Sequence, residues 1–243
     1  ENKPIADEVL ENEIPLQENS DDIIDESLPI DQVEENEQTT TMDMTNEDPG
    51  YLRTDPKVVG YNSHEEQDIL YDYVLSNFDP MQSSILDLGC GRGDFARHVE
   101  DGYQSDINYK GVDTNQTLLD IAKELSPDNQ FTCTNWFNLD GNYSADWVVN
   151  IHSSTILYEA VNEDFDPIQG LRNTIIKMLE LADVGIVISL LSTLAPDAYD
   201  EDYLVYDPIE TLDWALNEYG NIGGNVKLDH SMTDSIFTLT IYK

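Results

Sequence analysis

Three glycines alternate with other residues in the stretch ILDLGCGRGDF, residues 85–95, at Gly89, Gly91 and Gly93. They directly follow an apolar run and precede a helix-like pattern. Because glycine has no side chain, such a turn lets the backbone approach a ligand closely, and the start of the next helix favours negatively charged ligand groups. Dinucleotide sites use the spacing Gly-x-Gly-x-x-Gly, but Asp94 stands where the third glycine would be. The spacing therefore indicates a ligand-binding glycine turn and disfavours a nicotinamide-dependent reductase.

The elements around this turn alternate between strand and helix patterns from about residue 56 onward. A short turn joins the last two predicted strands, so the final strand must run antiparallel to its neighbour. We expect an α/β fold with a doubly wound, seven-stranded sheet, mostly parallel with a terminal antiparallel strand. The predicted strands are residues 83–89, 108–113, 130–135, 145–153, 185–194, 226–231 and 235–243, and the predicted helices are 62–78, 94–101, 115–125, 166–182 and 207–220.

Three of the predicted helices begin with a recognisable capping residue. Ser63 fits an N-cap, and Glu66 three residues later completes a capping box. Asp166 and Asp207 are each followed by proline, which is favoured in the first turn of a helix. Helical spacing predicts one buried apolar face for the first of these helices, formed by Ile69, Leu70, Tyr73 and Val74.

The N-terminal segment, residues 1–55, differs in composition from the rest of the chain. Residues 1–50 hold 17 acidic residues and one lysine, and Pro4, Pro15 and Pro29 interrupt their short apolar pairs. The apolar surface of this segment is too small for its burial to offset the chain entropy lost on folding. We therefore expect an acidic, extended or disordered tail. Its apolar pairs among acids make it a candidate segment for docking to a larger protein assembly. The folded domain is then residues 56–243.

The formal net charge of −39, with only 11 Lys and Arg, argues against a nucleic-acid partner because phosphates require a basic patch. Strong acidity either serves solubility or favours a cationic partner or substrate. No apolar run approaches the length of a membrane span, so we expect no membrane partner. Cys90 and Cys133 match no metal-ligand spacing, so we expect no metal site and a soluble protein in a reducing, cytoplasmic setting.

The pattern of an apolar residue, Asp87, an apolar residue and Gly-x-Gly-x-Gly resembles the first motif of class I S-adenosylmethionine-dependent methyltransferases. The resemblance covers roughly residues 60–243 and implies a Rossmann-like sheet that binds S-adenosylmethionine. It implies that Gly89, Gly91 and Gly93 line the methionine moiety of the cofactor, and that Asp87 faces its ammonium group, commonly through water. Asp113, at the end of the second strand, would accept hydrogen bonds from both ribose hydroxyls. The alternative for Asp113 is an ordinary turn residue that ends a strand.

The resemblance also assigns residues to the adenine and carboxylate ends of the cofactor. Asn135 follows the third strand, where the family usually has Asp, and its side-chain oxygen would accept from the adenine amino group. Trp136 would pack on the adenine ring, or alternatively belong to the core. Tyr61 precedes the first helix, where many members of the family cover the carboxylate end of the cofactor.

The segment after the fourth strand is where the family places residues that act on the acceptor. It contains His152, a candidate general base, although a single histidine there is more often packed and hydrogen-bonded. The proline pair of nucleic-acid amino-methyltransferases is absent, and Glu159 and Glu163 are too close together for the paired-glutamate loop of protein arginine methyltransferases. Residues 192–209 combine tyrosines, Tyr199 among them, with acids, which suits either a cationic substrate or a solvated lid.

Two functions from different classes are compatible with these features. The first is an S-adenosylmethionine-dependent transferase that methylates a small molecule or a protein. The second is a structural or interaction component that keeps the fold and docks through its acidic tail. The composition, rich in Asn, Ile, Asp and Tyr, is similar in style to that of bacteriophage proteins, so the second hypothesis includes a viral, virion-associated protein.

Overall fold

The computed structural model describes residues 49–103, 107–155, 166–195, 203–220 and 225–243. All of them belong to one unit of the chain, residues 38–243. The strands are β1 (Ser84–Leu88), β2 (Asn108–Asp113), β3 (Gln130–Cys133), β4 (Ala145–Asn150), β5 (Ala182–Ser192), β6 (Val205–Tyr206), β7 (Val226–Asp229) and β8 (Ile236–Tyr242). The α-helices are α1 (Pro49–Thr54), α2 (His64–Leu75), α3 (Asp94–Tyr103), α4 (Gln116–Leu125), α5 (Pro167–Leu181) and α6 (Pro208–Tyr219). The short 3₁₀ turns are η1 (Pro56–Val59), η2 (Trp136–Asn138), η3 (Gly141–Tyr143) and η4 (Ser153–Thr155).

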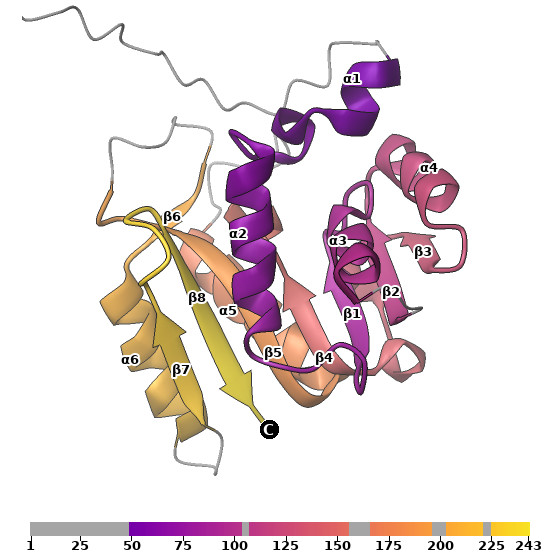
Figure 1. The fold of residues 1–243 in the computed structure, drawn as a ribbon. Helices are drawn as coiled ribbons and strands as arrows, with labels where there is room; N and C mark the ends of the chain where they lie inside the picture. The colour runs from indigo at the N-terminus through magenta and orange to yellow at the C-terminus, as the bar shows by residue number, and fades with distance from the viewer. Residues whose placement is uncertain (1–48, 104–106, 156–165, 196–202, 221–224) are drawn as a thin grey trace, which may run out of the picture. The chain divides into compact units, whose positions relative to one another are not determined.

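The strands form one sheet in the order β3-β2-β1-β4-β5-β8-β7, as Figure 1 shows. Strands β1 to β5 pair in parallel, whereas β8 runs antiparallel to both β5 and β7. The predicted doubly wound sheet with a terminal antiparallel strand is therefore confirmed. The sequence missed β6, which pairs with β5 at Leu191 and Ser192, beyond the last β4 pair at Ile188. A strand of two residues is too short to give a periodic pattern.

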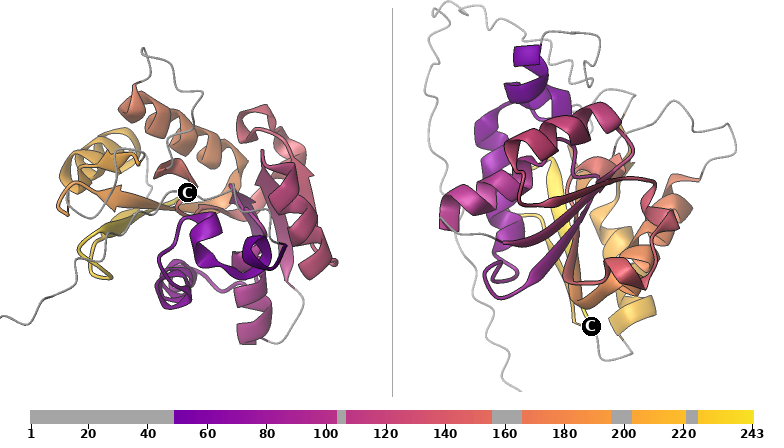
Figure 2. Two further views of the ribbon diagram at one scale, coloured as in Figure 1. Left: turned by 90° about the horizontal axis from the view of Figure 1, so that it is seen from above. Right: turned by 90° about the vertical axis from the view of Figure 1, so that its right-hand side faces the viewer.

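Helices cover both faces of the sheet, and Figure 2 shows α2 on one side and α5 and α6 on the other. Helices α2 and α3 pack on a layer that includes Tyr71, Phe95 and Tyr109. Helices α5 and α6 pack on a mainly aliphatic layer that includes Ile175 and Met178. The glycine turn lies between these layers at the carboxyl end of β1, which is where open α/β sheets bind their ligands.

The predicted caps are present, but the buried face of α2 matches the expected one only at Leu70 and Val74. Asp166 and Asp207 accept hydrogen bonds from the first backbone amides of α5 and α6. In α2, Ile69 is 46% exposed, whereas Gln67 and Tyr71 are buried with Leu70 and Val74. The hydrophobic pattern misplaced the face because two polar groups of α2 point inward and hydrogen-bond to each other there.

The N-terminal end of the described chain is the helix α1, which lies at the edge of the sheet toward which β1 and β4 point (Figure 1). The boundary predicted at residue 55 falls directly after it, so residues 49–54 are helical and not extended. Residues 1–48 lie outside the described residues, and their docking role stays a prediction. None of the helices in the described part of the chain has the length and apolar character that a membrane span requires.

Candidate active site

The glycine turn between β1 and α3 has the backbone that only glycine adopts easily. Gly89, Gly91 and Gly93 have φ angles of +84°, +54° and +74°, all in the left-handed region. A Cβ atom added to Gly89 would collide with the side chain of Ser153, and one added to Gly91 would lie 3.2 Å from Val59 Cγ1. A side chain is therefore excluded at Gly89 by backbone strain and lack of space, and it is disfavoured at Gly91 by backbone strain and a tight contact.

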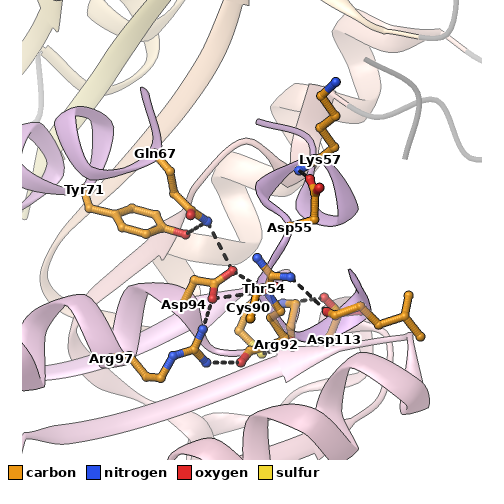
Figure 3. A network of polar contacts seen from close by, with 12 residues as sticks. Thr54, Asp55, Lys57, Gln67, Tyr71, Cys90, Arg92, Asp94, Arg97 and Asp113 are labelled. Atoms are coloured by element: carbon orange, nitrogen blue, oxygen red, sulfur yellow. Dashed lines mark hydrogen bonds and ion pairs between the residues drawn. The ribbon is translucent and has the colours of Figure 1, made fainter. Parts of the chain in front are cut away.

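Asp113 joins the end of β2 to the glycine turn (Figure 3). Its Oδ2 accepts a hydrogen bond from the backbone N of Gly91 at 2.9 Å, and its Oδ1 accepts one from the backbone N of Asn115 at 2.8 Å. A carboxylate offers about four acceptor positions, so about two remain for a ligand. The side chain is half-buried at the carboxyl edge of the sheet, where such a ligand would lie.

A buried ion pair between Arg92 and Asp94 lies at the end of the glycine turn (Figure 3). Arg92 is only 1% exposed, and its Nε lies 2.9 Å from Asp94 Oδ2. Its Nη1 donates to the carbonyl oxygen of Leu52 in α1 at 2.9 Å. Arg97 and Gln67 also donate to the Asp94 carboxylate. Sequence analysis missed Arg92 and Asp94 because a charged pair beside a glycine turn ordinarily predicts solvent exposure.

Asp87 is a carboxyl group inside the apolar layer. It is 2% exposed, and its Oδ2 accepts a hydrogen bond of 2.7 Å from the hydroxyl of Tyr109 on β2. Burial raises the pKa of Asp87 to about 7, the Tyr109 hydrogen bond opposes this rise, and the charge of Asp113 adds to it. A carboxyl group with this pKa changes its charge near neutral pH.

A small cavity of about 30 Å³ connects Asp87 to the glycine turn. That volume has room for one or two water molecules. The cavity is lined by Val59, Tyr61, Tyr71, Asp87, Gly89, Cys90, Gly91, Asp94, Phe95 and Ile151.

Tyr61 and His152 were predicted separately, and the structure brings them together. Their rings stack with centroids 5.1 Å apart and planes at 28°. His152 is 6% exposed and has a φ of +66°, uncommon for a residue other than glycine. Its backbone N donates to Ser189 Oγ at 2.8 Å. Burial lowers the pKa of His152 to about 4, against the opposite effect of a hydrogen bond with the backbone of Gly60. Its ring is therefore neutral at physiological pH.

Asn135 and Trp136 follow β3 at the same edge of the sheet. The preceding residue, Thr134, donates its backbone N to the carbonyl oxygen of Asp113 at 3.0 Å, which holds this segment beside the end of β2. Asn135 is exposed, and its Oδ1 accepts from the backbone N of Phe137 at 2.9 Å. Trp136 packs partly on the α5/α6 layer, and its Nε1 is buried with no hydrogen-bond partner among the described residues. Phe137 is 46% exposed and offers a second ring at this position.

The segment after β4 is fixed to the end of β1 by side chains that the sequence analysis did not single out. Asn150, fully buried, donates from Nδ2 to the Leu88 carbonyl oxygen at 2.9 Å, and Ser153 Oγ donates to the same oxygen at 3.0 Å. The only signal in the sequence is an asparagine at the end of an apolar strand. Tyr206 donates to the carbonyl oxygen of Ser154 at 3.1 Å, whereas Tyr199, Glu159 and Glu163 lie outside the described residues.

Comparison with known proteins identifies the class of domain that this site belongs to. Residues 85–164 match the family model described as a methyltransferase domain. No curated protein sequence matches the chain. Among solved structures, the methyltransferase domain of bacterial CtHen1-CN is similar, with 15% identity, a TM-score of 0.55, and coverage of 73% of this chain and 99% of that one.

Two further solved structures are similar at the same level. The plantazolicin methyltransferase BpumL in complex with SAH has 15% identity and a TM-score of 0.55, covering 79% of this chain and 92% of that one. A chain of the Pnkp1/Rnl/Hen1 RNA repair complex has 16% identity and a TM-score of 0.55, covering 76% of this chain and 42% of that one. The solved structures share the fold of this chain, so the predicted Rossmann-like fold is confirmed. The match of residues 85–164 agrees with the predicted methyltransferase class and its cofactor S-adenosylmethionine. These comparisons do not support a bacteriophage origin.

Proposed function

We propose that this domain transfers the methyl group of S-adenosylmethionine to a small-molecule or protein acceptor. The observation that carries the proposal is the junction of β1 and β2. There the left-handed glycine turn lies beside the carboxylate of Asp113, which still has acceptor positions free for a ligand. The backbone N of Gly91 is 2.9 Å from Asp113 Oδ2. The glycine turn has no side chains to block a ligand, and the Asp113 carboxylate can accept hydrogen bonds from two hydroxyl groups. This arrangement suits a nucleoside whose ribose lies at Asp113.

The other predicted residues extend this assignment in both directions along the edge. Asp87, through the small cavity, would hold the ammonium group, while Asn135 and the rings of Trp136 or Phe137 would hold the adenine. S-Adenosylmethionine, when bound, supplies an activated methyl group, so the chain's own residues have only to align an acceptor with it and exclude water.

His152 is the candidate base in this proposal. Its neutral ring is available to accept a proton, but a pKa of about 4 makes it a weak base at neutral pH. Its stacking on Tyr61 supports a second role, the positioning of that ring over the cofactor's carboxylate end. We expect its removal to act mainly through the placement of Tyr61.

Charge supports a cationic acceptor. Residues 156–165 and 196–202, which follow β4 and β5 in the chain, lie outside the described residues, but their sequence contains seven acids and no Lys, Arg or His. An amine- or guanidine-bearing small molecule or peptide fits such a composition, whereas a nucleic acid does not. RNA is nevertheless included among the acceptors to be tested, because one similar structure is that of an RNA repair complex.

Titration calorimetry with S-adenosylhomocysteine tests the cofactor assignment. We expect binding by the wild-type protein, and Asp113→Ala should weaken it by about 1.5–3 kcal/mol because hydrogen bonds to a charged group are lost. Asp120→Ala, on the exposed surface of α4, is the matched control and should bind as the wild type does. Binding of NAD without binding of S-adenosylhomocysteine would overturn the assignment.

Transfer of a radiolabelled methyl group to cationic small molecules, peptides and RNA then tests the acceptor class, and labelling of RNA alone would contradict the proposal.

A further inference from the structure

Tyr109 makes a contact that neither the motif nor the comparisons assign. We propose that Tyr109 is a positioning residue for the cofactor: its hydroxyl orients the buried carboxylate of Asp87 and keeps it ionised for the cofactor's ammonium group. The inference rests on the proposed function, because it requires that the ammonium group lie at Asp87. It adds a residue on β2 that contacts the cofactor only through Asp87.

The register of β1 and β2 places the two side chains on the same face. Ile85 pairs with Tyr109, and Asp87 pairs with Gly111, so Tyr109 reaches Asp87 diagonally across the strands. Gly111 leaves the position opposite Asp87 without a side chain, and a Cβ there would lie 2.7 Å from Cys90 Sγ. Gly111 therefore contributes no side chain toward the Asp87 carboxyl group, and Tyr109 is the residue of β2 that reaches it.

Tyr109 is suited to act as a donor throughout the working pH range. It is 3% exposed, and burial together with the neighbouring Asp87 charge raises the pKa of its hydroxyl well above the ordinary value. The phenol therefore stays protonated, and its hydrogen bond of 2.7 Å to Asp87 is present whenever the carboxylate is ionised.

Among the described residues, the titratable groups that share the cavity of Asp87 or interact with its charge include no cation. They are Tyr61 before α2, Tyr71 on α2, Cys90 in the glycine turn, Asp94 at the start of α3, Tyr109 on β2 and Asp113 at the end of β2. Three are neutral hydroxyl groups, one is a thiol and two are acids. The Tyr109 hydrogen bond is thus the contact that favours the ionised form before the cofactor binds.

Replacing Tyr109 by phenylalanine removes this hydrogen bond and keeps the ring. We expect Tyr109→Phe to weaken S-adenosylhomocysteine binding about tenfold at pH 7, the scale for losing a hydrogen bond to a charged group. The loss should shrink toward pH 8.5, because there the carboxyl of the variant ionises as well. 5′-Methylthioadenosine has the nucleoside but no ammonium group, so its affinity should not change. Tyr73→Phe, whose hydroxyl contacts Ser231 on the far side of α2, is the matched control.

A second variant guards against an effect of misfolding. Asp87→Asn should weaken S-adenosylhomocysteine binding at all pH values, and adding Tyr109→Phe to it should have no further effect on affinity. Unchanged affinity and pH profile in Tyr109→Phe would overturn the inference, as would equal weakening of S-adenosylhomocysteine and 5′-methylthioadenosine. If the wild-type protein binds neither compound, the proposed function fails, and this inference fails with it.

Discussion

The two layers that helices form on the sheet are built from different kinds of side chain. Under α5 and α6 the buried cluster is mainly Leu, Ile and Val, and Tyr206 is the one titratable residue among its described members. Under α2 and α3 the buried layer holds Tyr61, Tyr71 and Tyr109, with Asp87 and His152 beside them. The first layer is what apolar burial alone would select. The second retains polar groups whose burial is unfavourable unless each finds a partner.

This difference separates stability from function within one sheet. The burial of Asp87 and of His152 moves both pKa values toward the neutral form of each group, to about 7 and about 4. Such shifts mean that the folded protein holds these groups against their preference for water. The α5/α6 layer supplies the apolar burial that lets the α2/α3 layer keep them. Substitutions in the two layers should therefore change different measurable properties.

The largest effect should come from the aliphatic layer. Ile175 on α5 is fully buried, so Ile175→Ala should lower the free energy of unfolding by about 2–5 kcal/mol through lost burial and the cavity left behind. S-Adenosylhomocysteine affinity of the folded variant should stay within about twofold of wild type, since distant sites act independently. Its neighbour Ile176, 44% exposed, is the control, and Ile176→Ala should change stability by under about 0.5 kcal/mol. Urea unfolding and calorimetry measure both quantities, and a tenfold loss of affinity in Ile175→Ala would show that the layers are coupled.

Asp87→Asn should have the opposite signature in the polar layer. In wild type the folded carboxyl has a pKa of about 7 against an ordinary value of 3.8, so between these values the folded state binds more protons than the unfolded state. Wild-type stability at this site is therefore lost as pH rises toward 7. The asparagine variant avoids this loss and should be more stable at pH 8, by on the order of 1–3 kcal/mol.

The same comparison at lower pH provides the check. The advantage of Asp87→Asn should change little between pH 8 and pH 7 and then shrink as the pH of the urea titration is lowered from 7 to 5. Asp120→Asn, exposed on α4, should show no such pH-dependent difference from wild type. An asparagine variant that is less stable than wild type at pH 8 would mean that the ionised carboxylate stabilises the fold, and the contrast between the layers would then be wrong.

The sequence predicted the strands and helices far better than the buried polar contacts of the α2/α3 layer. Alternating patterns and capping residues such as Asp166 are local, so they locate strands and helices from the residues themselves. The signal for the glycine turn was also local, and the structure has a turn there with three left-handed φ angles. Which face of α2 is buried could not be predicted from the sequence. Gln67 points inward because it hydrogen-bonds to Tyr71 and Asp94, and Asp94 belongs to another helix.

The remaining gaps in the site have the same origin. The contact of Asn150 with the Leu88 carbonyl and that of Arg92 with the Leu52 carbonyl join residues 62 and 40 positions apart. No spacing rule connects such residues before the fold is known. The stacking of Tyr61 on His152 is a similar case, since each was singled out but nothing in the sequence paired them. Their catalytic and binding roles stay predictions.

The smallest effect should come from polar contacts at the outer surface of the α2/α3 side. His98 on α3 lies 3.1 Å from Asp68 Oδ1 and 2.8 Å from Asp72 Oδ1, both on α2. The two aspartates are largely exposed, so water competes for these contacts. His98→Ala should therefore lower the free energy of unfolding by under about 1 kcal/mol. S-Adenosylhomocysteine affinity should not change. Urea unfolding and calorimetry measure these two quantities, and a loss above about 2 kcal/mol would mean that polar contacts of this layer also stabilise the fold, which breaks the separation argued above.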